Sequence, residues 1–258
     1  MRHLFDPAGQ AALEALMRGR PLLAFDFDGT LAPIVARPDD ANIPAALAQR
    51  LGVLAAAAPV AIVTGRAVAD VRARLGFAPT YVIGNHGAED ETLAAPRSPL
   101  AQALDTLRAA VRKMSPALAR AGVVVEDKGL SMAFHYRLAA DALFALALIR
   151  DVVAQAPQGL HVFDGKRVVN AVPAGAPDKA HAVHRLRGRC GADGVLFAGD
   201  DLNDEPVFAA AEPGWVTVRI GNDGARPSQA RWFLDDTQQM APLLDRLIAL
   251  LPTPSKGA

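Results

Sequence analysis

Short apolar runs alternate with stretches of helical spacing over the first 84 residues. The apolar runs at residues 21–25, 59–63 and 81–83 are followed by Asp, Thr and Gly, which is typical of short buried strands. Apolar residues recur at helical spacing over residues 43–57 and again over residues 67–75. This alternation of strand and helix predicts a parallel sheet with helices on both of its faces.

The pattern changes between residues 98 and 173, where strands come in adjacent pairs. Two short turns, Asp127-Lys128-Gly129 and Asp164-Gly165-Lys166, each separate two runs of strand-like residues and predict antiparallel hairpins. The expected elements are helices at residues 100–121 and 141–155, and strands at residues 123–126, 131–136, 160–163 and 167–172. This region therefore reads as an α+β unit.

The first pattern resumes after residues 173–177, a linker-like stretch of Pro, Ala and Gly. We expect helices at residues 178–187, 205–211 and 237–251, and strands at residues 194–198 and 215–220. The simplest architecture is an α/β core made of residues 1–97 and 174–258. An α+β domain of residues 98–173 is inserted in it.

Composition narrows the class of function. Apolar residues make up 51% of the 258 residues, and 27 basic residues balance 27 acidic ones, so the charge favours neither nucleic acid nor a membrane as a partner. The single cysteine, Cys190, excludes an internal disulfide and a metal site built on cysteines. The N-terminus lacks a signal pattern and no apolar stretch approaches 18 residues, so we expect a cytoplasmic protein. We also expect a monomer.

Polar clusters follow the predicted strands of the core. In parallel sheets, ligands bind in the crevice beyond the carboxyl ends of the strands, where these clusters would meet. Lys179, which opens the helix after the linker, is expected to join them. The clusters are Asp26-Phe27-Asp28-Gly29-Thr30, Thr64-Gly65-Arg66, Gly84-Asn85-His86-Gly87 and Gly199-Asp200-Asp201-Leu202-Asn203-Asp204.

This set of groups suits the transfer of a phosphoryl group. Clustered carboxylates without cysteine suit Mg²⁺, which binds carboxylates, water and phosphate oxygens. Thr64 and Lys179 could hold a phosphate, with backbone N–H groups at the start of a helix. Asp26 and Asp28 are two residues apart on an extended segment and can face the same side, one as nucleophile and one as acid and base.

In this order, the motifs DxDGT, TGR, Lys and GDDxxD resemble those of the haloacid dehalogenase (HAD) superfamily of phosphohydrolases. The resemblance implies that Asp26 is the nucleophile and that Asp28 is the acid and base, its backbone carbonyl also binding Mg²⁺. It implies that Thr64 and Lys179 bind the phosphate. The implied metal site comprises Asp26, Asp28, Asp200, Asp201 and Asp204, of which the last two orient water or the lysine.

The finer resemblance is to the trehalose-6-phosphate phosphatases. It runs from about residue 22 to the last helix and rests on FDFDGTLAPI, IVTGR, GNHGAE, VEDKGLSMAFHYR, GKRVV and GDDLNDE. It implies a Rossmannoid parallel-sheet core with an inserted cap of the C2B type, and Mg²⁺-dependent hydrolysis of trehalose 6-phosphate. In the cap, Glu126 and Lys128 would bind sugar hydroxyls. Arg66, Asn85 and His86 would line the cleft from the core.

One departure leaves the exact sugar open. Where the family usually has a glutamate that contacts the sugar and a base two residues later, this chain has Asn170 and Val172, and Ala180 stands where Gly is usual. The amide of Asn170 still donates and accepts hydrogen bonds, so it is expected to bind substrate. A phosphatase for sucrose 6-phosphate or glucosylglycerol phosphate therefore remains an alternative. A phosphotransferase and a non-catalytic phosphate-binding domain are further ones.

Overall fold

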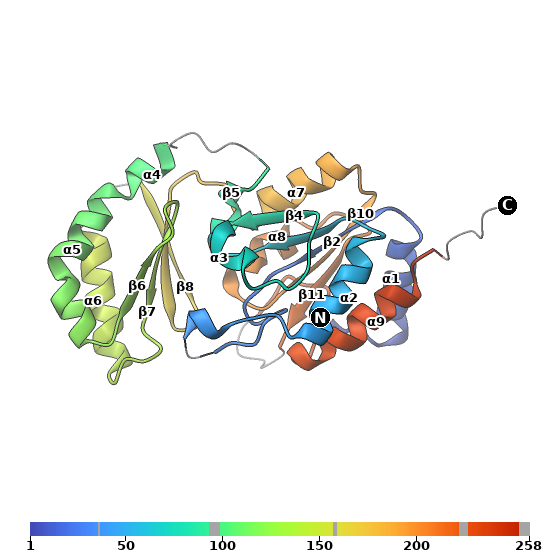
Figure 1. The fold of residues 1–258 in the computed structure, drawn as a ribbon, viewed down its shortest axis with the longest axis horizontal. Coiled ribbons are helices and arrows are strands. Elements are labelled where there is room, and N and C mark those ends of the chain that lie inside the picture. The colour runs from blue at the N-terminus through green and yellow to red at the C-terminus, as the bar shows by residue number, and fades with distance from the viewer. Residues whose placement is uncertain (36, 93–98, 157–158, 222–226, 253–258) are drawn as a thin grey trace.

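The structure is a computed structural model that describes residues 1–35, 37–92, 99–156, 159–221 and 227–252. Two lobes lie side by side, and each is built around its own sheet (Figure 1). The larger lobe holds an eight-stranded sheet and the smaller lobe a four-stranded one. None of the helices in these ranges has both the length and the apolar character that crossing a membrane requires.

The larger sheet has the strand order β1-β12-β11-β10-β2-β3-β4-β5 and is parallel except for β5. Strand β2 lies at its centre and pairs with β10, so Leu23 lies opposite Leu196 from the far end of the chain. The α/β fold class is thereby confirmed. The strands are β1 (Arg2–His3), β2 (Pro21–Phe25), β3 (Val60–Val63), β4 (Tyr81–Gly84), β5 (Glu89–Asp90), β10 (Gly194–Gly199), β11 (Val216–Ile220) and β12 (Trp232–Leu234).

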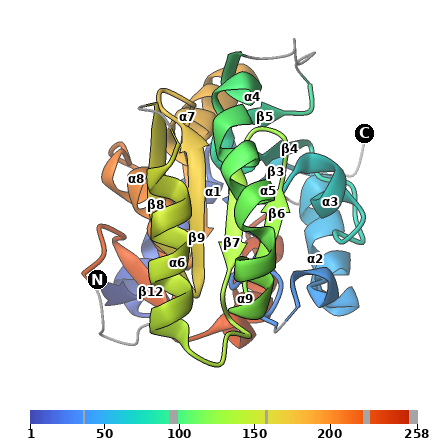
Figure 2. The ribbon, with the colours of Figure 1, turned by 90° about the vertical axis from the view of Figure 1, so that its left-hand side faces the viewer.

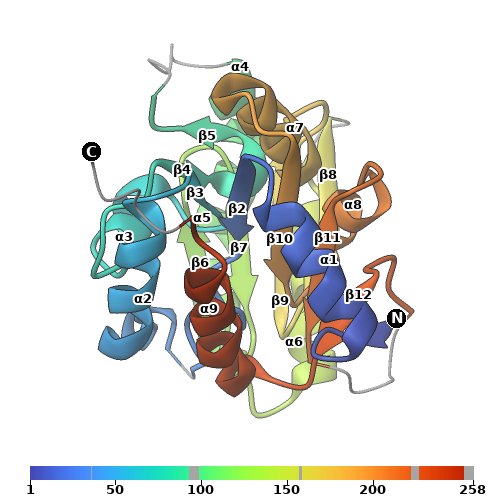
Figure 3. The same cartoon turned by 90° about the vertical axis from the view of Figure 1, so that its right-hand side faces the viewer.

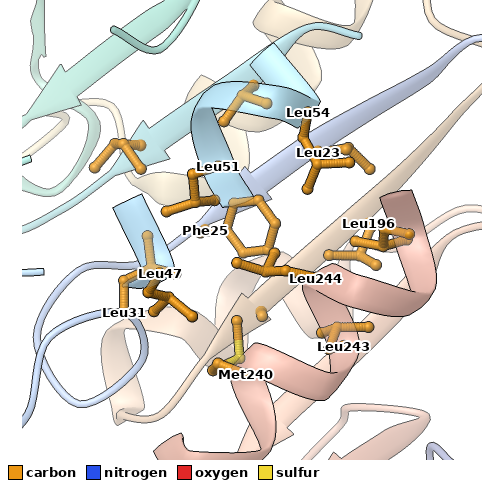
Figure 4. Packing of buried hydrophobic residues seen from close by; sticks show 14 of the residues in the cluster. Leu23, Phe25, Leu31, Leu47, Leu51, Leu54, Leu196, Met240, Leu243 and Leu244 are labelled. Atoms are coloured by element: carbon orange, nitrogen blue, oxygen red, sulfur yellow. The ribbon is translucent and has the colours of Figure 1, made fainter. Parts of the chain in front are cut away.

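Helices cover both faces of this sheet, as the continuous apolar runs of its strands require. On one face, α1 (Pro7–Met17), α2 (Ala45–Ala55), α3 (Val68–Arg72) and α9 (Met240–Ala249) bury a cluster around Phe25 (Figures 3 and 4). On the other face, α7 (Lys179–Cys190) and α8 (Glu205–Ala209) bury a second cluster around Phe197. The two clusters fix the sheet whose carboxyl edge carries the polar motifs.

The smaller sheet is antiparallel with the order β6-β7-β9-β8, from β6 (Val124–Asp127), β7 (Met132–His135), β8 (Leu160–Gly165) and β9 (Val168–Pro173). Helices α4 (Pro99–Ala103), α5 (Asp105–Arg120) and α6 (Ala142–Ala154) belong to the same lobe, and α5 and α6 lie in front of the sheet in Figure 2. Phe134 and Val169 belong to the apolar cluster on that face. The opposite face is left free to meet the larger lobe.

Local signals begin and end the helices near the site. The side chain of Asp178 accepts a hydrogen bond from the backbone N–H of His181 and caps α7, and Gly191 ends it in the left-handed conformation at φ 62°. The Asp141 side chain likewise caps α6. The helix expected over residues 100–121 is two helices, because at Leu104 the N–H turns back to the Ala101 carbonyl in a tighter i to i+3 bond.

The other predicted helices and strands are found, with ends that differ by a few residues. Helix α1 and the short strands β1, β5 and β12 have no counterpart in the prediction. The boundary expected between residues 97 and 98 lies outside the described residues. The division of the chain into catalytic core and cap stays a prediction.

Candidate active site

The loop after β2 brings Asp26 and Asp28 to the carboxyl edge of the larger sheet. The backbone N–H of Asp26 donates to the carbonyl of Ala198 on β10, which extends the sheet by one residue. Gly29 follows at φ +81°, and a Cβ there would lie 2.0 Å from Oδ2 of Asp200. Only glycine therefore allows the loop to pass so close to the Asp200 carboxylate.

A buried lysine at this edge bonds to one residue from the N-terminal segment of the larger lobe and one from its C-terminal segment. Nζ of Lys179 donates to Oδ1 of Asp26 and to Oδ1 of Asp204, each at 2.7 Å. Lys179 is 1% exposed and Asp204 is fully buried, so both ion pairs are shielded from water. The other oxygen of Asp204 accepts the backbone N–H groups of Asp200 and Asp201 at 2.9 and 3.0 Å. Asp204 thus fixes the short turn η3 (Leu202–Asp204) beneath the site.

Three buried carboxylates gather around this lysine. Oxygen atoms of Asp26, Asp200 and Asp204 all lie within 4.8 Å of one another. Burial raises the pKa of Asp26 well above its ordinary value, and the charges of Asp204 and Asp200 add to this against the opposing effect of Lys179. Burial also raises the pKa of Asp200, to about 7. For Lys179, burial acts to lower the pKa, but the two carboxylates outweigh it and the pKa is raised.

These features fit a divalent cation at the three carboxylates. Oxygen ligands in a compact buried group are the donor set that hard cations bind. Burial is the main cause of the raised pKa values of Asp26 and Asp200, and the neighbouring carboxylates add to it, so a cation bound here would favour their charged forms. The carboxylates of Asp28 and Asp201 lie outside this group of three, although both residues line the same cavity.

Arg66 holds the carboxylate of Asp28 from the side. Nε and Nη2 of Arg66 donate to the two oxygens of Asp28 at 2.7 and 2.8 Å, a bidentate pair. Nη1 donates to Asp70 at 2.7 Å, and Nη2 also donates to the carbonyl of Pro38. Arg66 is therefore occupied by the protein itself and orients Asp28 toward the cavity.

Thr64, Gly65 and His86 form the neighbouring wall. Oγ1 of Thr64 accepts the backbone N–H of Arg66 at 3.2 Å, and a Cβ on Gly65 would lie 2.3 Å from the ring of His86. Both ring nitrogens of His86 are buried without a hydrogen-bond partner among the described residues. Burial, and then the charges of Lys128 and Lys179, lower the pKa of His86 well below its ordinary value. His86 therefore faces the cavity as a neutral ring.

The free face of the smaller sheet forms the opposite wall. Glu126, Ala133, Asn170 and Phe163 lie directly opposite one another across its four strands, so their side chains share one face. Glu126 and Asn170 line the cavity. The rings of Phe163 and His86 pack edge to face, with their centroids 5.1 Å apart. His135 is two residues from Ala133, and its Nε2 donates to Oε2 of Glu126 at 3.0 Å.

Charged side chains of the smaller lobe reach across to the larger one. Nζ of Lys128 donates to the carbonyl of Gly65 at 2.9 Å and lies 3.7 Å from Oε2 of Glu126. Nζ of Lys166, at the tip of the β8–β9 hairpin, donates to Asp200. The backbone N–H of Lys166 donates to Oδ2 of Asp201 at 3.3 Å. Asp201 thus contacts the hairpin as well as capping η3.

The cavity between the lobes has a volume of about 120 Å³. Most residues that the sequence predicted as site residues line it: Asp26, Asp28, Thr64, Arg66, His86, Glu126, Lys128, Asn170, Asp200 and Asp201. Lys179 and Asp204 support it from below, through the contacts to Asp26 and to η3. Asn85 does not line it, because its side chain bonds to Ser131 and Glu89 instead.

Three basic residues that line the cavity, Lys166, His135 and Arg137, were absent from the predicted site. Lys166 lies at the turn of the second predicted hairpin and within the GKRVV motif, and these two features were its signals. His135 could have been found from the alternation of side chains along its strand, which places it on the face of Ala133. Arg137 is the last residue of the VEDKGLSMAFHYR motif, which was its signal; it donates to the carbonyl of Val35.

The parallel core, its acidic cluster at the carboxyl edge and the second sheet facing it define a HAD-like α/β protein. Residues 24–238 match the family model described as Trehalose-phosphatase, and the chain belongs to this family. The chain is 35% identical over 263 residues to a trehalose-phosphate phosphatase of Mycobacterium marinum, covering 94% of this chain and 66% of that protein. It is 36% identical over 254 residues to an uncharacterized glycosyl hydrolase of Mycobacterium tuberculosis, covering 91% of this chain but 19% of that protein.

Solved structures share the fold at lower identity. The C-terminal domain of the Candida albicans trehalose-6-phosphate phosphatase matches with a TM-score of 0.73 and 22% identity, covering 93% of this chain and 96% of that one. A trehalose-6-phosphate phosphatase related protein matches with a TM-score of 0.74 and 22% identity, covering 89% and 97%. These likenesses support the HAD-like fold.

Proposed function

We propose that this chain hydrolyses trehalose 6-phosphate to trehalose and phosphate through an aspartyl-phosphate on Asp26. The observation that carries the proposal is the buried bridge of Lys179 to Asp26 and Asp204, beside Asp200 and under a cavity shared by the two lobes. The trehalose-phosphate phosphatases named among its relatives support the choice of substrate.

In this proposal the two lobes have separate tasks. Residues 1–97 and 174–258 form the catalytic core, and residues 98–173 form a cap of the C2B type that recognises the sugar. The sequence-based expectation of a cytoplasmic monomer with a small-molecule substrate, and without a nucleic-acid or membrane partner, belongs to the same proposal.

The core residues would divide the chemistry between them. A carboxylate oxygen of Asp26 attacks phosphorus, the bond to the sugar oxygen breaks, and Asp28 donates its proton to that oxygen. Asp28 then takes a proton from water as the water oxygen attacks the phosphorus of the aspartyl-phosphate, which releases phosphate and restores Asp26. Arg66 keeps Asp28 in place for both steps, while Thr64 and Lys179 hold phosphate oxygens.

We assign Mg²⁺ to the acidic cluster. Asp26, Asp200 and the backbone carbonyl of Asp28 would hold it, with Asp204 and Asp201 orienting its surroundings. When bound there, it supplies positive charge that offsets the carboxylates and the phosphate. Lys166 of the cap bonds to Asp200 in this cluster.

The sugar would lie against the free face of the smaller sheet. Glu126, Lys128 and Asn170 would bind its hydroxyls from the cap, and His86 would contact it from the core. The pKa of Glu126 is lowered because His135 and Lys128 outweigh the opposing effect of burial, so a charged acceptor faces the cavity. An amide at position 170 is compatible with more than one sugar, which keeps sucrose 6-phosphate and glucosylglycerol phosphate as alternatives.

A substrate panel tests the proposal. Phosphate release is measured with and without Mg²⁺ on trehalose 6-phosphate, sucrose 6-phosphate, glucosylglycerol phosphate and glucose 6-phosphate. We expect Mg²⁺-dependent release with the highest kcat/KM on trehalose 6-phosphate. Faster release from another sugar phosphate would retain the chemistry and reject the substrate. No release from any of them would reject the phosphatase assignment.

A further inference from the structure

A buried hydrogen bond joins the two lobes outside the cavity. Oγ of Ser131 donates to Oδ1 of Asn85 at 2.5 Å, and each residue is 1% exposed. Neither residue lines the cavity. Nδ2 of Asn85 donates to Glu89 at 2.7 Å and to the backbone carbonyl of Lys128 at 3.3 Å. The side-chain amide of Asn85 therefore bonds to two residues of the loop between β6 and β7, here called the cap loop: Lys128 and Ser131.

The backbone conformation at Asn85 and His86 directs these two neighbouring side chains to different places. Asn85 and His86 both have positive φ, 48° and 59°, in the short turn η2 (Asn85–Gly87), and Asn and His are among the residues that tolerate this conformation best. The N–H of Asn85 donates to the carbonyl of Arg66, and the N–H of His86 to that of Thr64. The turn directs Asn85 to the cap loop and the ring of His86 to the cavity.

The same loop carries Lys128 into the cavity. The backbone N–H of Lys128 donates to the carbonyl of Ser131 at 2.9 Å, which closes the loop on itself. With the Ser131 hydroxyl and the Lys128 carbonyl both held by Asn85, the side chain of Lys128 is placed where Nζ reaches Gly65. The position of Lys128 thus depends on a bond that contains none of its own side-chain atoms.

We propose that Asn85 and Ser131 form a latch that holds the cap closed and positions Lys128 on the substrate. Ligand cavities are typically about 300 Å³ or larger, so the cavity of about 120 Å³ must widen to admit a sugar phosphate. Opening breaks the latch, and closing on the substrate remakes it. Asn85 and Ser131 are positioning residues that act through Lys128. As far as it concerns a sugar phosphate, this inference rests on the proposed function.

Ser131→Ala tests the latch with two substrates. Trehalose 6-phosphate reaches the cap, whereas p-nitrophenyl phosphate offers the core a phosphate without a sugar. We expect Ser131→Ala to raise KM for trehalose 6-phosphate about tenfold, because Asn85 loses its partner, with kcat/KM for p-nitrophenyl phosphate within twofold of wild type. Ser131→Thr, which keeps the hydroxyl, should recover most of the loss. The matched control is Ser115→Ala, the same change at an exposed position of the cap helix α5.

A double variant and hydrogen exchange complete the test. If the two residues act as one latch, Asn85→Ala combined with Ser131→Ala should raise KM little more than either change alone. The amide of Lys128 should exchange faster in Ser131→Ala than in Ser115→Ala. Unchanged KM and exchange, or equal losses on both substrates, would overturn the latch. Should wild type release no phosphate from trehalose 6-phosphate, the proposed function fails, and the exchange comparison decides on the latch by itself.

Discussion

The core and the smaller lobe face the same cavity, but they hold their charged groups differently. Asp26, Asp204 and Lys179 are at least 95% buried and their ion pairs lie within the larger lobe. Glu126 has a side chain that is 35% exposed, and Lys128 and Lys166 bond to atoms of the other lobe. The charged groups of the larger lobe are held by contacts within that lobe. The positions of Lys128 and Lys166 depend on how the two lobes pack against each other.

This difference suggests that the two halves fail in different ways. A change in the buried cluster acts on charged groups that are largely shielded from water, so its effect should be large. A change in the smaller lobe acts on groups that opening of the cavity exposes anyway, so it should affect substrate binding more than stability. Variants of residues in each lobe test whether the buried cluster controls activity and stability while the smaller lobe controls substrate binding.

The largest effect is expected from Asp26→Asn. The amide keeps a hydrogen bond to Lys179 but is a poor nucleophile, so turnover of trehalose 6-phosphate should fall about 10⁴-fold or more. Phosphate release measures the activity of the variant, and a thermal melt measures whether it is folded. The control is Asp193→Asn, an exposed carboxylate of the core paired with Arg20. Turnover near that of wild type would remove Asp26 from the role of nucleophile.

Lys179→Met should reduce the free energy of unfolding by about 3–5 kcal/mol. Asp26 and Asp204 would stay buried without the cation that bonds to both of them. Urea unfolding in the presence of a chelator measures the loss, and Mg²⁺ should recover part of it if the cation binds the same carboxylates. Lys113→Met, at an exposed position of α5, is the control. A loss below about 1 kcal/mol would mean that the buried cluster tolerates an unpaired charge.

Lys128→Met should separate the two halves most clearly. One charge-assisted hydrogen bond from the smaller lobe is lost, so KM for trehalose 6-phosphate should rise about 10–100-fold. The kcat/KM for p-nitrophenyl phosphate and the unfolding of the core should stay close to those of wild type. Steady-state kinetics on both substrates provides the comparison. Equal losses on both substrates would place Lys128 with the core machinery instead.

The sequence predicted the core half of the site better than the other half for a physical reason. Asp26, Thr64 and Asp200 each follow a strand, and parallel strands bring such positions to one edge, so local pattern was enough. The contact of Lys166 with Asp200, and that of Ser131 with Asn85, depend on how two lobes pack. Residues 46 positions apart in the sequence, as Asn85 and Ser131 are, share no periodicity that would pair them.

The smallest effect is expected from the pH dependence of Glu126. Burial acts to raise its pKa, but His135 and Lys128 outweigh it and hold the pKa below its ordinary value of 4.5. Stability from this carboxylate is therefore present above pH 4.5 and is lost as the pH falls through the lower, folded-state pKa. Thermal melts between pH 6 and about pH 3 should show wild type more stable than Glu126→Gln at the upper end, with the gap narrowing as the pH falls. Asp151→Asn, at an exposed position of α6, is the matched control. A gap between wild type and Glu126→Gln that does not change with pH would contradict the stabilisation of the Glu126 carboxylate by His135 and Lys128.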